Sequence, residues 1–213
     1  MFDPKILPLT RKMLDIPARL LVRLGINADQ VTIAGFVIGL LAVPLLAFDL
    51  YGLALVAILL NRLCDGLDGA VARRTQLTDA GGFIDIVLDF IFYSAVVFGF
   101  MLASPEQNAI AAGVLLVTFM GTGATFLAFA SVAGKRGIEN PSYPNKSLHY
   151  MGGLTEGFET ILAFVAFCLW PQYFAVLAYA FAAACWLTAI TRIVAGYRTL
   201  KKGKAPQPGP GNV

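Results

Sequence analysis

The stretch Asn61–Asp89, NRLCDGLDGAVARRTQLTDAGGFIDIVLD, decides the fold of this chain. It connects the polar end of one apolar run to the polar start of the next. Asp65 and Asp68 are three residues apart in the first run, so they share one face of a helix. Asp85 and Asp89 are four apart in the second run and share a face in the same way. Carboxylates in a membrane-spanning segment are costly and are functional candidates by default.

The composition of the chain makes lipid the solvent for these helices. Of 213 residues, 58% are hydrophobic and only 14% are charged, and the mean hydropathy is +0.73. Soluble domains carry about half apolar residues and about a quarter charged. The composition therefore excludes an ordinary soluble enzyme and predicts a lipid bilayer as the main partner, with no nucleic acid.

Apolar runs along the chain predict an all-α integral membrane protein with six spans, each near the roughly 20 residues needed to cross the hydrocarbon core. We place these spans at Val31–Phe48, Tyr51–Arg73, Gly81–Ala103, Asn108–Ala133, Gly152–Trp170 and Gln172–Tyr197.

Three parts of the chain are expected. Residues 1–26 form an amphipathic interfacial segment, an N-terminal juxtamembrane helix broken near Pro8 and Pro17. Residues 27–200 form a six-helix transmembrane domain that contains the four aspartates. Residues 201–213, rich in Lys, Gly and Pro, form a disordered cytoplasmic tail.

The distribution of basic residues predicts the orientation. Three short connections carry no Lys or Arg: Phe48–Tyr51, Ser104–Asn108 and Trp170–Gln172. The opposite side carries the basic N-terminal segment and the basic C-terminal tail, together with Arg73, Arg74, Lys135, Arg136 and Lys146. By the positive-inside rule, both termini and the aspartates face the cytoplasm of an inner membrane.

The short loop between the second and third spans is expected to make them antiparallel neighbours whose four carboxylates converge. Such a cluster needs cations, and hard oxygen ligands favour Mg²⁺, Mn²⁺ or Ca²⁺ over zinc. Two divalent ions suit a phosphoryl-transfer site. The alternative is that the aspartates pair with Arg62, Arg73 or Arg192 to hold the bundle together, although buried ion pairs stabilise weakly.

This pattern resembles the signature of the class I CDP-alcohol phosphotransferases, D-x-x-D-G-x-x-A-R, a spacer, then G-x-x-x-D-x-x-x-D. The fixed positions here are Asp65, Asp68, Gly69, Ala72, Arg73, Gly81, Asp85 and Asp89. The seven-residue spacer Arg74–Ala80 is one residue shorter than is usual in the family, which affects the register of Thr78.

The resemblance implies transfer of a phosphatidyl group from CDP-diacylglycerol to a small alcohol, with release of CMP. It implies that Asp65, Asp68, Asp85 and Asp89 bind two divalent cations, Mg²⁺ or Mn²⁺, with Asp89 also the general base. It assigns the cytidine diphosphate part of the donor to Gly69, Arg73, Thr78 and the segment Ala28, Asp29, Gln30 and Val31.

The acceptor pocket is less well specified. Arg192 lies inside the last span, where its position resembles an arginine that binds acceptor phosphate in some family members. Lys135 and Arg136 would assist it, or they follow the positive-inside rule alone. Glu156 and Glu159 share a helix face, and they either line the acceptor pocket or neutralise Arg192.

Other functions remain as alternatives. One is a CDP-alcohol phosphotransferase, of the CDP-choline type, with a lipid acceptor. Another is a cation transporter, which the apolar run after Asp89 disfavours because it offers no polar path to the far side. The motif Gly35-x-x-x-Gly39 is typical of close helix contacts and leaves a homodimer open.

Overall fold

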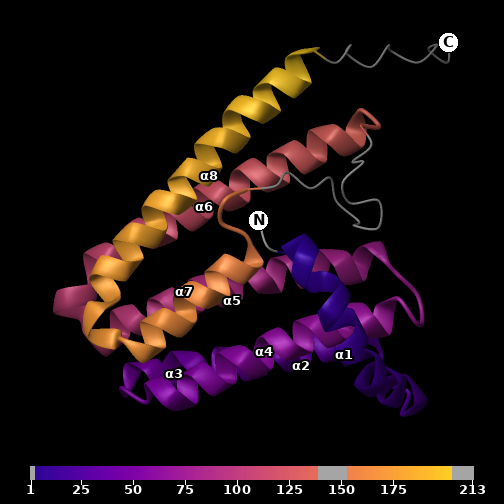
Figure 1. The fold of residues 1–213 in the computed structure, drawn as a ribbon, viewed down its shortest axis with the longest axis horizontal. Coiled ribbons are helices and arrows are strands. Elements are labelled where there is room, and N and C mark those ends of the chain that lie inside the picture. The colour runs from indigo at the N-terminus through magenta and orange to yellow at the C-terminus, as the bar shows by residue number, and fades with distance from the viewer. Residues whose placement is uncertain (1–2, 139–152, 203–213) are drawn as a thin grey trace, which may run out of the picture.

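The structure, a computed structural model, describes residues 3–138 and 153–202. All regular structure within these ranges is helical (Figure 1), which confirms the all-α prediction. The elements are α1 Asp3–Arg23, α2 Ala28–Leu40, α3 Ala42–Ala47, α4 Tyr51–Ala72, α5 Asp79–Ala103, α6 Pro105–Lys135, α7 Gly157–Leu169, the 3₁₀ helix η1 Pro171–Tyr173, and α8 Phe174–Lys202. Lys201 and Lys202, the first two residues of the predicted disordered tail, are the last two residues of α8. Lys146 and residues 203–213 of the tail lie outside the described residues.

Within the described part of the chain, four helical units are long and apolar enough to cross a membrane. They are Ala28–Ala47, Asp79–Ala103, Pro105–Lys135 and Pro171–Lys201. α4 has 22 residues, but its apolar sequence is interrupted by one arginine and two aspartates. α7 is apolar but has 13 residues, fewer than the roughly 20 that span the hydrocarbon core. The six-span count therefore stays a prediction.

The first predicted span is divided into two helices. α2 ends at Leu40, and α3 begins at Ala42. Pro44 has no N–H to donate to the carbonyl of Leu40, so the regular hydrogen-bond ladder is interrupted there. At the same point, the N–H of Leu41 bonds to the carbonyl of Ile38, three residues back, at 3.1 Å. This is the tighter 3₁₀ pattern.

The expected breaks in the N-terminal segment are absent from α1, which is one helix across Pro8 and Pro17. A proline inside a helix removes one hydrogen bond, and tertiary contacts can offset that loss. Ala18 is fully buried against Ala70 and Val71 of α4, and Asp15 forms an ion pair with Arg74. These contacts hold α1 against the end of α4 that carries the aspartates.

The apolar core lies toward the other end of α4 and α5. Tyr51 at the start of α4 stacks on Phe100 near the end of α5, with ring centroids 6.1 Å apart. Phe100 also stacks on Phe174 of α8 at 4.8 Å. α6 and α8 pack along each other (Figure 1). This aromatic packing anchors the helices at one end and leaves the opposite end for polar side chains.

Candidate active site

A small pocket lies between α2, α4 and α5. Its lining includes all four aspartates together with Thr32, Asn61 and Arg62. α5 packs chiefly against α2, α3 and α6, while α4 packs against α1, α2, α3 and α7. Side chains of α4 and α5 also meet directly, in agreement with the expected convergence of these two helices: Nη2 of Arg62 lies 2.6 Å from Oδ1 of Asp89, and Tyr51 stacks on Phe100. α2 contacts both helices, and the pocket occupies the space between them.

Close approach of α2 to α4 is made possible by two glycines. A Cβ added to Gly35 would lie 2.5 Å from Cβ of Cys64, and one added to Gly39 would lie 2.8 Å from the amide nitrogen of Asn61. Both distances are too short for any larger residue. The Gly35-x-x-x-Gly39 motif therefore serves a helix contact within the chain.

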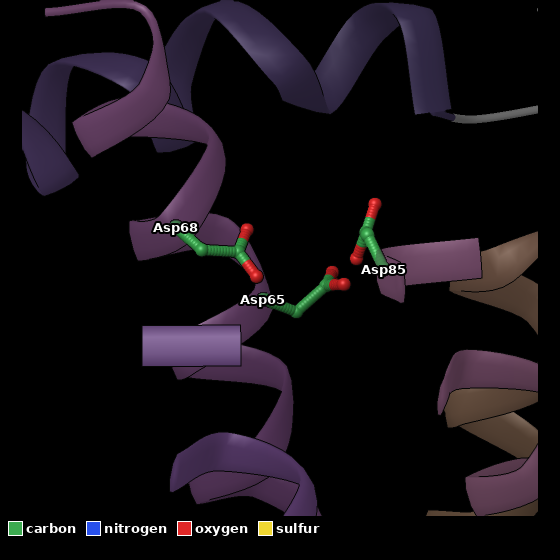
Figure 2. Close-up of side chains that lie close together, drawn as sticks. All are labelled: Asp65, Asp68 and Asp85. Atoms are coloured by element: carbon green, nitrogen blue, oxygen red, sulfur yellow. The ribbon is translucent and has the colours of Figure 1, made fainter. Parts of the chain in front are cut away.

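Three of the four aspartates form a tight cluster. Carboxylate oxygens of Asp65, Asp68 and Asp85 all lie within 4.8 Å of one another. Figure 2 shows Asp65 and Asp68 side by side on α4, with Asp85 approaching from α5. An all-oxygen, anionic donor set of this kind fits a hard divalent cation such as Mg²⁺ or Mn²⁺.

Asp68 is held by a residue that the sequence pattern does not reveal. The hydroxyl of Thr32 on α2 donates to Oδ2 of Asp68 at 2.6 Å. Asn27 and Gln30 form a capping box that fixes the first turn of α2, and Thr32 follows one turn later. The resemblance points to the segment Ala28–Val31, but the side chain that contacts the carboxylates comes from the next position. The signal for it is a hydroxyl directly after that segment.

Asp89 has a different environment from the other three. Its Oδ1 accepts a hydrogen bond from Nη2 of Arg62 at 2.6 Å, and Nη1 of Arg62 lies 3.7 Å from Asp65. Asp89 lines the same pocket, but it is not part of the three-carboxylate cluster. The sequence indicates Arg62 as one candidate ion-pair partner of the aspartates. Its position three residues before Asp65 places it on the same helix face as that carboxylate.

The residues predicted to bind the donor lie at the end of α4 and at the start of α5. A Cβ added to Gly69 would lie 3.1 Å from Nη1 of Arg73, so this guanidinium folds back over the glycine. Thr78 caps α5 by accepting a hydrogen bond from the N–H of Gly81 at 3.0 Å. Asp29 reaches the same place, because its Oδ1 lies 3.0 Å from a Cβ added to Gly81. Their contact with a donor remains a prediction.

The remaining donor-segment residues have local roles at the start of α2. Val31 is buried, and the carbonyl of Ala28 accepts from the hydroxyl of Thr32 at 3.1 Å. The side chain of Gln30 accepts from the N–H of Asn27 at 3.0 Å. These contacts position α2 over the pocket.

The predicted acceptor residues lie on α6, α7 and α8. Arg192 is buried on α8, and its Nη1 donates to the carbonyl of Thr122 at 3.3 Å. Glu156 and Glu159 form a capping box at the start of α7. Among the described residues, the lining of the aspartate pocket does not include these three side chains.

The basic end of α6 is tied to α8. Nη1 of Arg136 donates to the carbonyl of Leu200 at 2.5 Å, and Lys135 is exposed in the last turn. This contact gives Arg136 a structural role, and an acceptor role for either residue remains a prediction.

Comparison with known proteins places the chain in one family. Residues 25–196 match the family described as CDP-alcohol phosphatidyltransferase. The Escherichia coli K12 inner membrane protein YnjF is 57% identical over 201 residues, which cover 94% of this chain and 98% of that protein. An archaetidylinositol phosphate synthase from Pyrococcus horikoshii is 35% identical over 99 residues, covering 46% of this chain and 53% of the relative.

Solved structures share the fold. Phosphatidylinositol phosphate synthase (PgsA1) of Mycobacterium tuberculosis with CDP-DAG bound has a TM-score of 0.72 at 24% identity, covering 87% of this chain and 94% of that chain. The same enzyme with manganese and citrate has a TM-score of 0.73 at 24% identity, covering 93% and 96%. The apolar helices of the present chain and its inner-membrane relative identify it as a multi-pass inner membrane protein. It belongs to the CDP-alcohol phosphatidyltransferase family.

Proposed function

We propose that this protein transfers a phosphatidyl group from CDP-diacylglycerol to the hydroxyl of a polar alcohol, releasing CMP. The observation that carries the proposal is the convergence of Asp65, Asp68 and Asp85 within 4.8 Å, beside Asp89 in the same pocket. Family membership supports the reaction class. A CDP-DAG complex of a protein with the same fold supports the donor.

The donor set fits divalent cations, and we propose two, Mg²⁺ or Mn²⁺. Asp65, Asp68 and Asp85 would hold one, and Asp89 would contribute to the other. When bound, the cations supply positive charge for the pyrophosphate of the donor and for the charge that develops during transfer. Thr32 orients Asp68 for this purpose, since its hydroxyl occupies Oδ2 at 2.6 Å. Outer-shell hydrogen bonds of this kind fix the direction of a ligating carboxylate.

In the transfer itself, the acceptor oxygen forms a bond to the lipid-bearing phosphorus, and the bond from that phosphorus to the CMP oxygen breaks. CMP leaves with the electron pair. The proton of the acceptor hydroxyl passes to the carboxylate of Asp89, which acts as general base. Arg73 lies over Gly69, where it would place positive charge against the donor phosphates. Thr78 and the segment 28–31 would contact the cytidine end.

For the acceptor, we propose a pocket built on Arg192, with Glu156 and Glu159 as further lining residues and with Lys135 and Arg136 as cations that assist from the end of α6. The burial of an arginine on a membrane helix supports it, because such residues are rare and mark substrate paths. A guanidinium binds phosphate in a bidentate manner, so the arginine favours a phosphorylated alcohol.

The membrane arrangement that we propose has six spans, with α1 lying at the cytoplasmic interface and both termini on that side. Exposed apolar side chains support the place of α1: Met13, Ile16, Leu20 and Leu24 recur at helical spacing. The buried Ala18 lies on the side that packs against α4. α1 thus presents one apolar face to the protein and another to its surroundings.

The test is a CMP-release assay. The purified protein in lipid nanodiscs receives CDP-diacylglycerol and Mg²⁺ or Mn²⁺, with glycerol 3-phosphate, inositol phosphate, serine, choline and phosphatidylglycerol as separate acceptors. We expect metal-dependent CMP release with one of them, and none from an Asp85→Asn variant. If the protein releases CMP from CDP-choline and diacylglycerol but not from CDP-diacylglycerol with any acceptor, the CDP-alcohol phosphotransferase alternative replaces the proposal. If no pair releases CMP, the proposal fails.

A further inference from the structure

Arg62 is a charged side chain inside α4 that is only 14% exposed. Its guanidinium carbon lies 4.8 Å from the ring centroid of Phe92 and 5.2 Å from that of Tyr93, both on α5. An arginine in a membrane helix is costly unless its surroundings use the charge. The two rings and the pocket carboxylates provide those surroundings.

Three nitrogens of Arg62 are each committed to a different residue. Nε donates to Oδ1 of Asn61 at 2.7 Å, Nη1 donates to the hydroxyl oxygen of Tyr93 at 3.0 Å, and Nη2 donates to Oδ1 of Asp89 at 2.6 Å. Asn61 is itself fixed, since its amide donates to the carbonyl of Gly35 at 2.9 Å. A planar group held along three directions has a defined orientation.

The consequence for the aspartates is asymmetric. Arg62 contacts Asp89 at 2.6 Å, whereas its nearest approach to Asp65 is 3.7 Å. Asp65, Asp68 and Asp85 cluster with one another, whereas Asp89 is paired with the guanidinium of Arg62. Because Arg62 occupies Oδ1 of Asp89, the other oxygen of that carboxylate is left for the reaction.

We propose that Arg62 is a positioning residue for phosphatidyl transfer, which rests on the proposed function. It fixes Asp89 so that Oδ2 receives the proton of the acceptor hydroxyl, and its charge limits the attraction of the pocket for cations. An ion pair that merely stabilised the bundle would need the charge and not the three-way geometry. The two roles therefore differ in what a lysine can replace.

The first arm measures cation binding without turnover. Mn²⁺ is titrated into the purified protein in nanodiscs, without donor, and followed by electron paramagnetic resonance. Arg62→Gln removes a positive charge next to the cluster, so we expect Mn²⁺ to bind about tenfold more tightly or better. Arg62→Lys keeps the charge, and its Mn²⁺ affinity should stay within about threefold of wild type. Weaker or unchanged Mn²⁺ binding by Arg62→Gln would overturn the proposal.

The second arm measures turnover of the same proteins. Misplacing a reacting group by about 1 Å costs roughly 100-fold, so we expect a kcat loss of that order in Arg62→Gln. Arg62→Lys should lose about tenfold in kcat despite its charge, because an ammonium cannot make the three directed bonds. KM for the donor should change little in both. Wild-type kcat in Arg62→Lys would show that charge alone suffices and would overturn the proposal.

A third pair of variants leaves every charge in place. Tyr93→Phe removes one anchor of Arg62, and we expect a several-fold fall in kcat with unchanged Mn²⁺ affinity. Ser94→Ala is the matched control, because among the described residues its hydroxyl donates to the carbonyl of Phe90 in its own helix at 2.9 Å, and its kcat should match wild type. If Arg62→Gln does not fold, equal kcat in Tyr93→Phe and wild type would still refute the idea.

The arms also separate this inference from the function on which it rests. A wild-type protein that releases no CMP with any donor and acceptor would refute the proposed reaction. The Mn²⁺ titration of Arg62→Gln would still be readable in that case, and tighter binding would support the part of the inference that concerns the charge of Arg62.

Discussion

Thr32 gives the most direct test of how the pocket is built. Its hydroxyl lies 2.6 Å from Oδ2 of Asp68 and 3.1 Å from the carbonyl oxygen of Ala28. A hydroxyl has one proton, and the shorter contact to a carboxylate takes most of it. Thr32→Val keeps the shape of the side chain and removes this bond, leaving a carboxylate oxygen without its protein donor.

The magnitude follows from the kind of bond that is lost. A hydrogen bond to a charged group contributes about 1.5–3 kcal/mol, which corresponds to roughly tenfold to 100-fold in an equilibrium constant. Outer-shell partners of metal ligands show the same range when they are removed, about tenfold to 100-fold in affinity. We therefore expect the Kd for Mn²⁺ to rise by about tenfold or more in Thr32→Val.

The assay is Mn²⁺ titration of the purified protein in nanodiscs, with CMP release as a second measurement. Thr32→Ser restores the hydroxyl and should stay within about threefold of wild type. Thr125→Val is a matched control on α6, where the hydroxyl donates to the carbonyl of Thr122 at 2.9 Å, and should leave Mn²⁺ binding unchanged. Wild-type Mn²⁺ affinity in Thr32→Val would show that Thr32 does not orient a ligand, which refutes this reasoning.

Four further predictions concern the metal, the base, the acceptor and the helix packing. EDTA should abolish CMP release and Mg²⁺ or Mn²⁺ should restore it, so turnover in chelator would contradict the metal site. Asp89→Asn should remove turnover and leave donor binding intact, whereas Asp68→Asn should lower both turnover and Mn²⁺ affinity. If the two variants changed turnover and binding to the same extent, separate roles for the two aspartates would be contradicted. Arg192→Lys should raise the KM of a phosphorylated acceptor roughly tenfold through loss of a charge-assisted bond, and a lower melting temperature with unchanged KM would assign the arginine to the bundle. Gly35→Ala places a Cβ 2.5 Å from that of Cys64 and should lower the free energy of unfolding by about 1–3 kcal/mol. Thermal unfolding of Gly35→Ala and of the double variant Gly35→Ala/Cys64→Gly would measure this. A double variant no more stable than Gly35→Ala would contradict the contact.

The sequence by itself determined the class of fold and the chemical character of the site. Spacings of three and four residues within apolar runs are local information, because adjacent turns of a helix bring such residues to one face. For that reason the spacing alone pairs Asp65 with Asp68, and Asp85 with Asp89. Hydropathy likewise identifies membrane helices, since a backbone in lipid must satisfy its own hydrogen bonds.

Only the tertiary structure decided how the four aspartates are divided. Thr32 lies 36 residues from Asp68 and Arg62 lies 27 residues from Asp89, and no periodic pattern relates such positions. Their pairing depends on the close approach of α2 to α4 at Gly35, and hence on which side chains fill the space between helices. Local spacing can place carboxylates on one helix face, but the partner of each carboxylate is set by packing between helices that are distant in sequence.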